Sequence, residues 1–372
     1  MKLKLILFLF VFSLFLSCKK NNLPEKDSLI SNNLNENGKY KSNEVVITGT
    51  TDDIIVFQYL NIATETNLTL NQNKTQKVKK EIIGDSLHLV INSIDKPLFA
   101  LVQASASKSN FYRRWIFLIP GDTISIKVKN GEMKFYGKNA MYNNFYTELD
   151  KNTPEYNKNP YQGSLMEYKN RVKSIYDKRI AFFRKFVETN NIKSKLFLNT
   201  IETNLKHEYL HNIINPAYTK AQFVEGLYFN DSDILYSLLY EEQDKNPETI
   251  IDLKNYFKKV SIDEFKNLDA FHNSPFYRTN IVEYVRYYFL NSKHIPYSKE
   301  MFLAEKEFIQ KNFDGEIENY AIVSLLRSYH LKGFGNSVNT IQIMKDLIYE
   351  YKKNSFLFNC YFYKRECFRR FS

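Results

Sequence analysis

The segment His207-Glu208-Tyr209-Leu210-His211 combines residue types and a spacing that could support metal-dependent chemistry. Its pattern is H-E-x-x-H. On a helix, His207 and His211 lie one turn apart on one face, where two imidazoles can bind Zn²⁺. Glu208 would then be the general base that activates a metal-bound water. On this interpretation the chain is a zinc metallopeptidase, with zinc as its cofactor.

The surrounding sequence favours a coincidental match. A metzincin carries a third histidine further along the chain, but Ile214 and Ala217 stand at the relevant positions. Pro216 would end the helix soon after His211. A gluzincin takes its third ligand from a glutamate on a following helix. The available glutamates, none of them in a recognisable partner motif, are Glu225, Glu241 and Glu242.

The helical wheel adds a further argument. At 100° per residue the predicted helix has one apolar stripe, formed by Leu198, Ile201, Leu205, Tyr209 and Ile213. The opposite side carries Thr200, Thr203, Asn204, His207 and His211. We therefore expect the two histidines to lie on a solvated polar face. We therefore assign no catalytic residue, metal ligand or cofactor. The alternative is a zinc site with His207 and His211 as ligands and Glu208 as the catalytic residue.

Cys18 is the residue whose chemistry is best defined by its surroundings. Lys2 and Lys4 precede an apolar run, Leu5 to Leu16, that is too short to cross a bilayer core of about 20 residues. This is typical of a signal peptide. The run ends Phe15-Leu16-Ser17-Cys18, which resembles the bacterial lipobox apart from Phe15, where leucine is usual. We expect cleavage before Cys18 and its acylation, which would anchor the chain in a lipid bilayer.

Two further cysteines, Cys360 and Cys367, lie near the end of the sequence. They could pair in an oxidising periplasm, although on a helix they would be two turns apart and too distant to bridge. Their spacing is neither a C-x-x-C redox motif nor a zinc-ligand pattern. A redox role for this pair stays open.

The elements that must position these residues fall into two classes. Short strands with alternating apolar residues and turn signals are predicted at 44–49, 54–60, 78–83, 86–91, 99–105, 114–119, 123–129 and 134–136. Helical periodicity then predicts helices at 139–149, 165–188, 196–214, 231–242, 247–259, 262–268, 278–291, 298–311, 316–331 and 337–353.

The predicted fold class is α+β, with an N-terminal antiparallel β-sandwich or barrel-like domain followed by a mostly α-helical domain. The expected segments are a lipoprotein signal peptide at 1–17, a flexible tether at 18–43, an antiparallel β domain at 44–137, an α-helical domain at 138–355 and an atypical tail at 356–372. The formal net charge of +11 is spread along the chain rather than gathered in a motif, so nucleic acid is not expected as a partner.

Two stretches carry a family resemblance. The phrase Phe117-Leu118-Ile119-Pro120-Gly121-Asp122-Thr123-Ile124 resembles the closing hairpin of a β-sandwich domain of unknown function. Phe135-Tyr136-Gly137-Lys138-Asn139-Ala140, followed by Asn143-Asn144-Phe145, is similar to its junction with the first helix. Both belong to lipoproteins of Bacteroidetes-type bacteria that carry a thioredoxin-like, thiol–disulfide oxidoreductase domain. The resemblance covers most of residues 44–355.

The resemblance has functional implications. The stretch Lys206 to Tyr218 resembles a spacer helix in which other members lack H-E-x-x-H. Family members continue into a thioredoxin domain with a W-C-x-x-C motif, whereas this sequence stops at Ser372. The resemblance therefore predicts that the redox domain is missing because of a truncation or frameshift. We expect a non-catalytic scaffold or binding module, with envelope proteins as its partners. Lys19 follows Cys18, so no acidic residue marks inner-membrane retention, and an outer-membrane anchor facing the periplasm is favoured.

Overall fold

The computed structural model describes residues 42–64, 78–92, 94–95, 97–105, 111–153, 165–214, 260–286, 294–295, 297–334 and 337–352. Outside these ranges lie Cys18 with the signal segment, Cys360 and Cys367, and the helices predicted at 231–242 and 247–259. The three glutamates considered as third zinc ligands also lie outside them. Within the described residues, no helix is long and apolar enough to cross a membrane.

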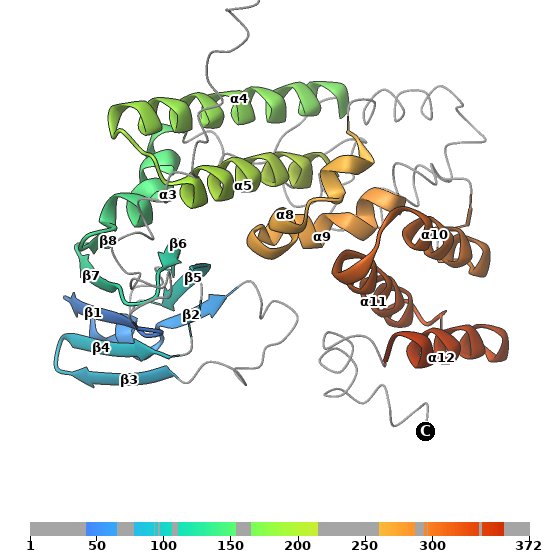
Figure 1. Ribbon diagram of the computed structural model, residues 1–372, viewed down its shortest axis with the longest axis horizontal. Coiled ribbons are helices and arrows are strands. Elements are labelled where there is room, and N and C mark those ends of the chain that lie inside the picture. Colours follow the sequence, from blue (N-terminus) through green and yellow to red (C-terminus); the bar gives the residue numbers. More distant parts are fainter. Residues whose placement is uncertain are drawn as a thin grey trace, which may run out of the picture.

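The N-terminal part folds into two open sheets (Figure 1). Its elements are β1 (Val45–Thr51), α2 (Ile54–Gln58), β2 (Asn61–Thr64), β3 (Val78–Ile83), β4 (Ser86–Ile91), β5 (Leu98–Ser105), β6 (Phe111–Leu118), β7 (Thr123–Lys129) and β8 (Glu132–Tyr136). One sheet has the order β3-β4-β1-β7-β8 and the other β2-β5-β6. The predicted α+β class and sandwich are confirmed. The barrel-like variant is wrong because the sheets do not close, and β1 pairs with β7 in parallel rather than antiparallel.

The two sheets and the first helices form three layers. Between the sheets lies a core that includes Ile47, Leu89 and Ile126 from the five-stranded sheet and Val102 and Ile116 from the three-stranded sheet. The three-stranded sheet is buried on its other face too, because its outward residues pack under helices. This explains why β5 has a nearly continuous apolar sequence instead of a strict alternation.

The segment predicted as a strand at 54–60 is instead mostly the short helix α2. The Asp53 side chain caps it by accepting a hydrogen bond from the Ile55 N–H at 3.2 Å. Phe57 of this helix covers Gly49 so closely that a Cβ at Gly49 would lie 2.7 Å from the ring. A short apolar run cannot distinguish a strand from a buried helical turn by periodicity alone, which is why the sequence prediction failed here.

The helices follow the sheets. They are α3 (Ala140–Asn152), α4 (Leu165–Thr189), α5 (Lys195–Ile214), the 3₁₀ turn η6 (Ile262–Phe265), α8 (Leu268–Asn273), α9 (Pro275–Tyr284), α10 (Lys299–Asn312), α11 (Gly315–Leu331) and α12 (Val338–Lys352). Most of the predicted helices in the described ranges therefore exist with ends displaced by only a few residues. The exception is the segment predicted at 262–268, which is a 3₁₀ turn followed by the start of α8.

Helix α3 joins the two sheets through consecutive asparagines. Asn143 Oδ1 accepts the Phe117 N–H of β6 at 2.9 Å. Asn144 binds β8 at Phe135, accepting its N–H at 3.0 Å and donating to its carbonyl at 2.7 Å. These bonds satisfy backbone groups on an edge strand of each sheet, which would otherwise be unpaired beneath a helix.

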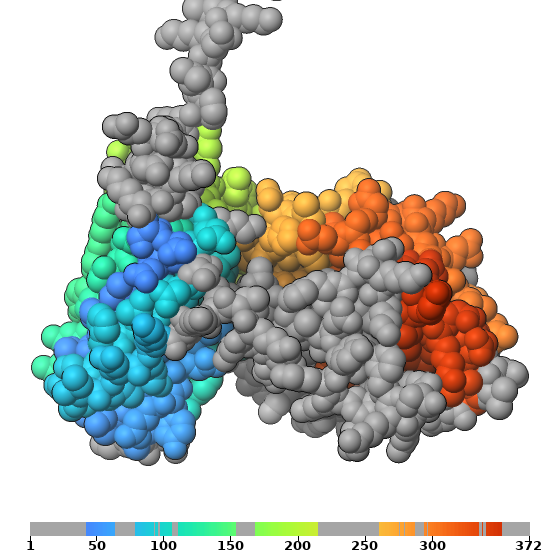
Figure 2. All heavy atoms as spheres, turned by 60° about the horizontal axis from the view of Figure 1, so that its bottom comes forward, coloured from blue at the N-terminus to red at the C-terminus, as the bar shows by residue number. Residues whose placement is uncertain are grey.

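Helix α5 belongs to two hydrophobic cores. Its first half contributes Phe197, Ile201 and Leu205 to the core beneath the three-stranded sheet. Its last turns contribute Leu210 and Ile213 to the core of the C-terminal helices. The strands and the C-terminal helices form lobes on opposite sides of the molecule (Figure 2). Helix α5 therefore links the two lobes and carries the H-E-x-x-H segment.

Candidate functional site

The H-E-x-x-H segment is buried, which corrects the expected solvated face. Thr200, Asn204 and His207 are all at least 96% buried, and Glu208 is also buried. The face that carries the histidines packs against α8 and α9, while the opposite side packs against α4. The helical wheel was right that Ile201, Leu205 and Ile213 are buried. It failed because it assumed that a helix buries one face only, whereas α5 lies between two layers.

His207 lies among aromatic rings. Its imidazole makes edge-on contacts with Tyr277 at 5.0 Å and Phe265 at 5.9 Å between ring centroids. Burial lowers its pKa from 6.5 to about 3, with a smaller contribution from the positive charge of Lys206. The ring is therefore neutral at physiological pH, and its buried Nδ1 has no hydrogen-bond partner among the described residues.

His211 is fixed by α9. Asn280 donates from Nδ2 to the His207 carbonyl at 3.3 Å, which leaves its Oδ1 facing His211 Nδ1 at 2.7 Å. With that amide orientation, His211 donates its Nδ1 proton and its Nε2 is the unprotonated nitrogen. Burial lowers the pKa of His211, and the bond to Asn280 opposes this effect.

Glu208 faces a different partner. Its Oε2 lies 3.2 Å from Arg179 Nε of α4. Arg179, which is itself buried, also reaches Asp150 at 3.2 Å and donates to Thr153 Oγ1 at 3.1 Å, both at the end of α3. Glu208 is thus one anionic partner of an arginine that ties three helices together.

The structure brings His207 and His211 together on one face but gives each a different neighbour. Among the described residues, no group of three or more His, Cys, Asp or Glu side chains is placed to hold a metal ion. A general base for a metal-bound water must be available to that water, whereas the Glu208 carboxylate is bound to Arg179. The observed contacts therefore give these residues roles in helix packing.

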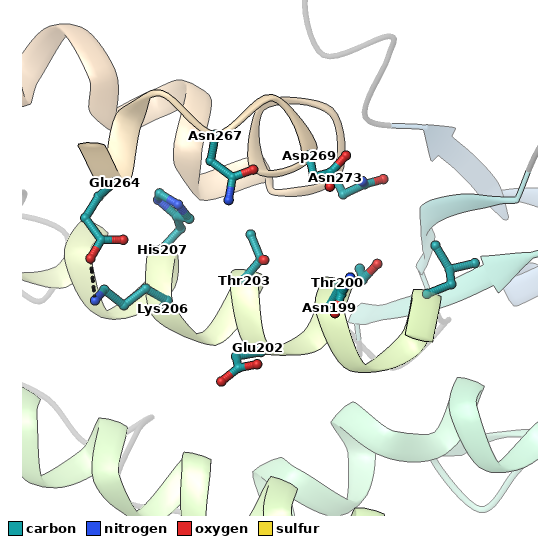
Figure 3. Close-up of a pocket in the computed structure, with 11 residues that line it drawn as sticks. Asn199, Thr200, Glu202, Thr203, Lys206, His207, Glu264, Asn267, Asp269 and Asn273 are labelled. Carbon is teal, nitrogen blue, oxygen red and sulfur yellow. Dashed lines mark ion pairs between the residues drawn. The ribbon is translucent and has the colours of Figure 1, made fainter. Parts of the chain in front are cut away.

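A polar cleft of about 370 Å³ lies beside His207 (Figure 3). One side is a face of α5, and the other is formed by η6 and α8. The described lining residues are Leu196, Asn199, Thr200, Glu202, Thr203, Lys206, His207, Glu264, Asn267, Asp269 and Asn273. Five of them offer amide or hydroxyl groups and only Leu196 is apolar, so this surface is suited to hydrogen bonding.

The charges around the cleft are partly neutralised. Lys206 Nζ forms an ion pair with Glu264 Oε1 at 2.8 Å, which closes one end (Figure 3). Glu202 points away from α8, toward the opposite side of α5. Asp269 is exposed on the far side of the cleft, close to Asn273. Asn267 uses its Oδ1 to cap α8 through the Ala270 N–H at 3.0 Å, so its amide nitrogen stays available.

The helical wheel placed Thr200, Thr203 and His207 on one polar face, which is the α5 side of this cleft. The α8 side was missed because Asn267, Asp269 and Asn273 are about 60 residues further along the chain and form no motif. One signal was present: Asn267 and Asp269 are typical of the start of a helix. That signal predicts a helix end but says nothing about what faces it.

A second buried charged cluster lies among the C-terminal helices. Arg286 Nε donates to Glu305 Oε1 at 2.9 Å, and neither side chain is exposed. The guanidinium also donates to the Tyr297 hydroxyl at 3.2 Å and lies 4.9 Å from its ring. Tyr297 has a positive φ of 58°. This cluster joins the end of α9 to α10, and its Arg286–Glu305 pair is fully buried, so we assign it to the core.

Models of known protein families, curated protein sequences and solved structures were all compared with the chain, and none of them matches it.

Proposed function

We propose that this protein is a lipid-anchored envelope protein whose folded part is a non-catalytic binding or scaffold module. The anchor is supported by the signal-like run Leu5 to Leu16 and the lipobox-like sequence that ends at Cys18. The relation to the N-terminal part of thioredoxin-family lipoproteins is supported by the hairpin and junction sequences described above. The expected partners are the bilayer, through Cys18, and other envelope proteins.

The observation that carries the non-catalytic proposal is the contact between Glu208 and Arg179. Glu208 is the one residue of the H-E-x-x-H segment that could activate water, and its carboxylate is 3.2 Å from a buried guanidinium. Beside the segment lies an accessible cleft with many neutral hydrogen-bonding groups. Such a surface is suited to holding a ligand rather than transforming it.

The proposed location is the outer membrane, with the folded part facing the periplasm. Lys19 follows Cys18, so the acidic residue that marks inner-membrane retention is lacking there. Residues 18–43 are rich in polar residues and would act as a tether between bilayer and folded part. Membrane fractionation on a sucrose gradient, followed by protease treatment of intact cells, tests this location. Recovery in the inner-membrane fraction, or digestion in intact cells, would contradict it.

The alternative is a zinc metallopeptidase that uses His207, His211 and Glu208. The tautomer of His211 leaves its Nε2 free of a proton, as a zinc ligand requires. Metal analysis of the purified protein separates the two functions. Zinc at one equivalent in the natural chain, lost in His211→Ala, would favour the peptidase. Absence of zinc from the protein purified without chelators would remove that alternative.

A further inference from the structure

The cleft between α5 and α8 has a composition that defines a ligand class. We propose that it binds a neutral, hydroxyl-rich small molecule of the size of a mono- or disaccharide. This proposal rests on the proposed binding function and names the ligand of that function. It is carried by the groups that line the cleft, by one buried polar atom and by the arrangement of charge.

The lining groups can both donate and accept hydrogen bonds. Asn199 and Asn273 each present an amide oxygen and an NH₂, and Thr203 presents a hydroxyl. A sugar hydroxyl also donates and accepts at once. Closely spaced groups of this kind bind vicinal hydroxyls, because each amide can contact two neighbouring oxygens.

His207 supplies the buried polar group. Its side chain lines the cleft, is 2% exposed, and has an Nδ1 without a partner among the described residues (Figure 3). A buried polar atom without a partner costs free energy. Because burial keeps the pKa of His207 near 3, the ring is a neutral hydrogen-bonding group. It gives no charge with which to attract an anion.

The remaining charges also disfavour anions. Lys206 is the cation of the cleft wall, and Glu264 already pairs with it at 2.8 Å. Asp269 adds a negative charge on the other wall. A phosphate or carboxylate would meet repulsion from Asp269 without an available cation among the described lining residues. A neutral ligand avoids this cost.

The cleft lacks the features of an apolar or peptide site. Leu196 is the main apolar side chain among the described lining residues, and none of these is Phe, Tyr or Trp. Peptide sites place apolar side chains in pockets or add a strand to a sheet, and the walls here are helices. The volume of about 370 Å³ lies within the roughly 300–1,000 Å³ of small-molecule sites.

Calorimetry with the full acylated protein tests the proposal. The protein is kept in a detergent without a sugar headgroup, such as lauryldimethylamine oxide, so that the detergent does not compete. The probes are glucose, N-acetylglucosamine and maltose, with inorganic phosphate as the anionic comparison. Thr203→Val and Asn199→Ala each remove a lining group, and Asn199 is exposed, so its replacement leaves folding intact. Lys185→Gln is the control, because Lys185 is exposed on α4 and is not among the described lining residues of the cleft.

The expected result is saturable binding of at least one sugar. Each lining variant should weaken it by about 5-fold or more, the effect of losing one hydrogen bond of about 1 kcal/mol, and Lys185→Gln should not change it. No sugar binding, tighter binding of phosphate, or sugar binding that both lining variants leave unchanged would overturn the proposal. The anchor is judged separately, because the mass of the same sample reports acylation whether or not a sugar binds.

Discussion

At the scale of single residues, the H-E-x-x-H segment shows how burial changes the meaning of a motif. His207 and His211 have the spacing of zinc ligands, yet the first is surrounded by aromatic rings and the second is bound by Asn280. Glu208 faces Arg179. The sequence could predict the spacing and the helix. It could not predict these neighbours, because they come from α4 and α9, far away along the chain.

Burial of His207 predicts a stability that depends on pH. Its pKa falls from 6.5 to about 3 on folding, so between these values the unfolded chain binds a proton that the folded chain does not. The contribution of the neutral His207 to the free energy of unfolding is therefore present in full above about pH 6.5 and is lost as the pH falls toward 3. At about pH 5 this residue should cost about 2 kcal/mol of unfolding free energy relative to about pH 7.

Urea unfolding at the two pH values, in the natural protein and in His207→Phe, measures this contribution. The variant should lose less stability on acidification, while retaining the dependence due to His211, whose pKa is also lowered. Equal pH dependence in the two proteins would contradict the buried, neutral state of His207.

At the scale of elements, the sequence located most of the described strands and helices, but not their surroundings. Periodicity identified β7 and α5 with nearly their observed ends because these elements are long or strictly alternating. It failed for α2, which has a single turn of apolar residues, and for the buried face of α5. Contacts such as Asn144 to Phe135 join separate elements, and a single sequence carries no signal for them.

Arg179 is predicted to stabilise the packing of α3, α4 and α5. Arg179→Met leaves Glu208 as a buried carboxylate without its cation, and we expect a loss of about 3–5 kcal/mol in unfolding free energy. The double variant Arg179→Met/Glu208→Met should recover most of this loss, since it removes both charges. Urea titration measures the unfolding free energy of the single and the double variant. A single variant as stable as the natural protein would show that this ion pair does not hold the helices together.

The asparagine contacts of α3 are predicted to protect the edge of the five-stranded sheet. In Asn144→Ala, the Phe135 N–H and carbonyl lose their partners, which should cost about 1–3 kcal/mol. Hydrogen exchange of the Phe135 amide should become faster. Asn152→Ala is the matched control on the same helix, because Asn152 donates to the Glu148 carbonyl in an exposed hydrogen bond. Unchanged exchange at Phe135 in Asn144→Ala would refute this role.

At the scale of the whole molecule, two lobes are joined through α5, and the cleft lies at that junction. The three-layered N-terminal lobe and the C-terminal helices have separate cores, and both α4 and α5 contribute residues to each. A ligand in the cleft contacts both α5 and α8. We therefore expect ligand binding to stabilise the packing between the lobes by mass action.

Membrane attachment through Cys18 is the prediction that belongs to the whole chain. Cys18→Ala should prevent acylation and move the protein from the membrane fraction to the soluble fraction, because the acyl chains provide its bilayer affinity. Cys360→Ser is the matched control and should stay in the membrane fraction. Immunoblotting of the separated fractions measures both. If the Cys18→Ala variant stayed in the membrane fraction after a carbonate wash, this result would contradict a lipid anchor at this residue.

Native mass spectrometry of the natural protein extracted from membranes tests the central claim most directly, because one mass reports the N-terminus, the acyl groups and bound metal. A lipid-anchored, non-catalytic module predicts a chain that begins at Cys18, carries a diacylglycerol with a further acyl chain, and holds no zinc. A chain that begins elsewhere without lipid, or a mass that includes one zinc ion lost on His211→Ala, would contradict it.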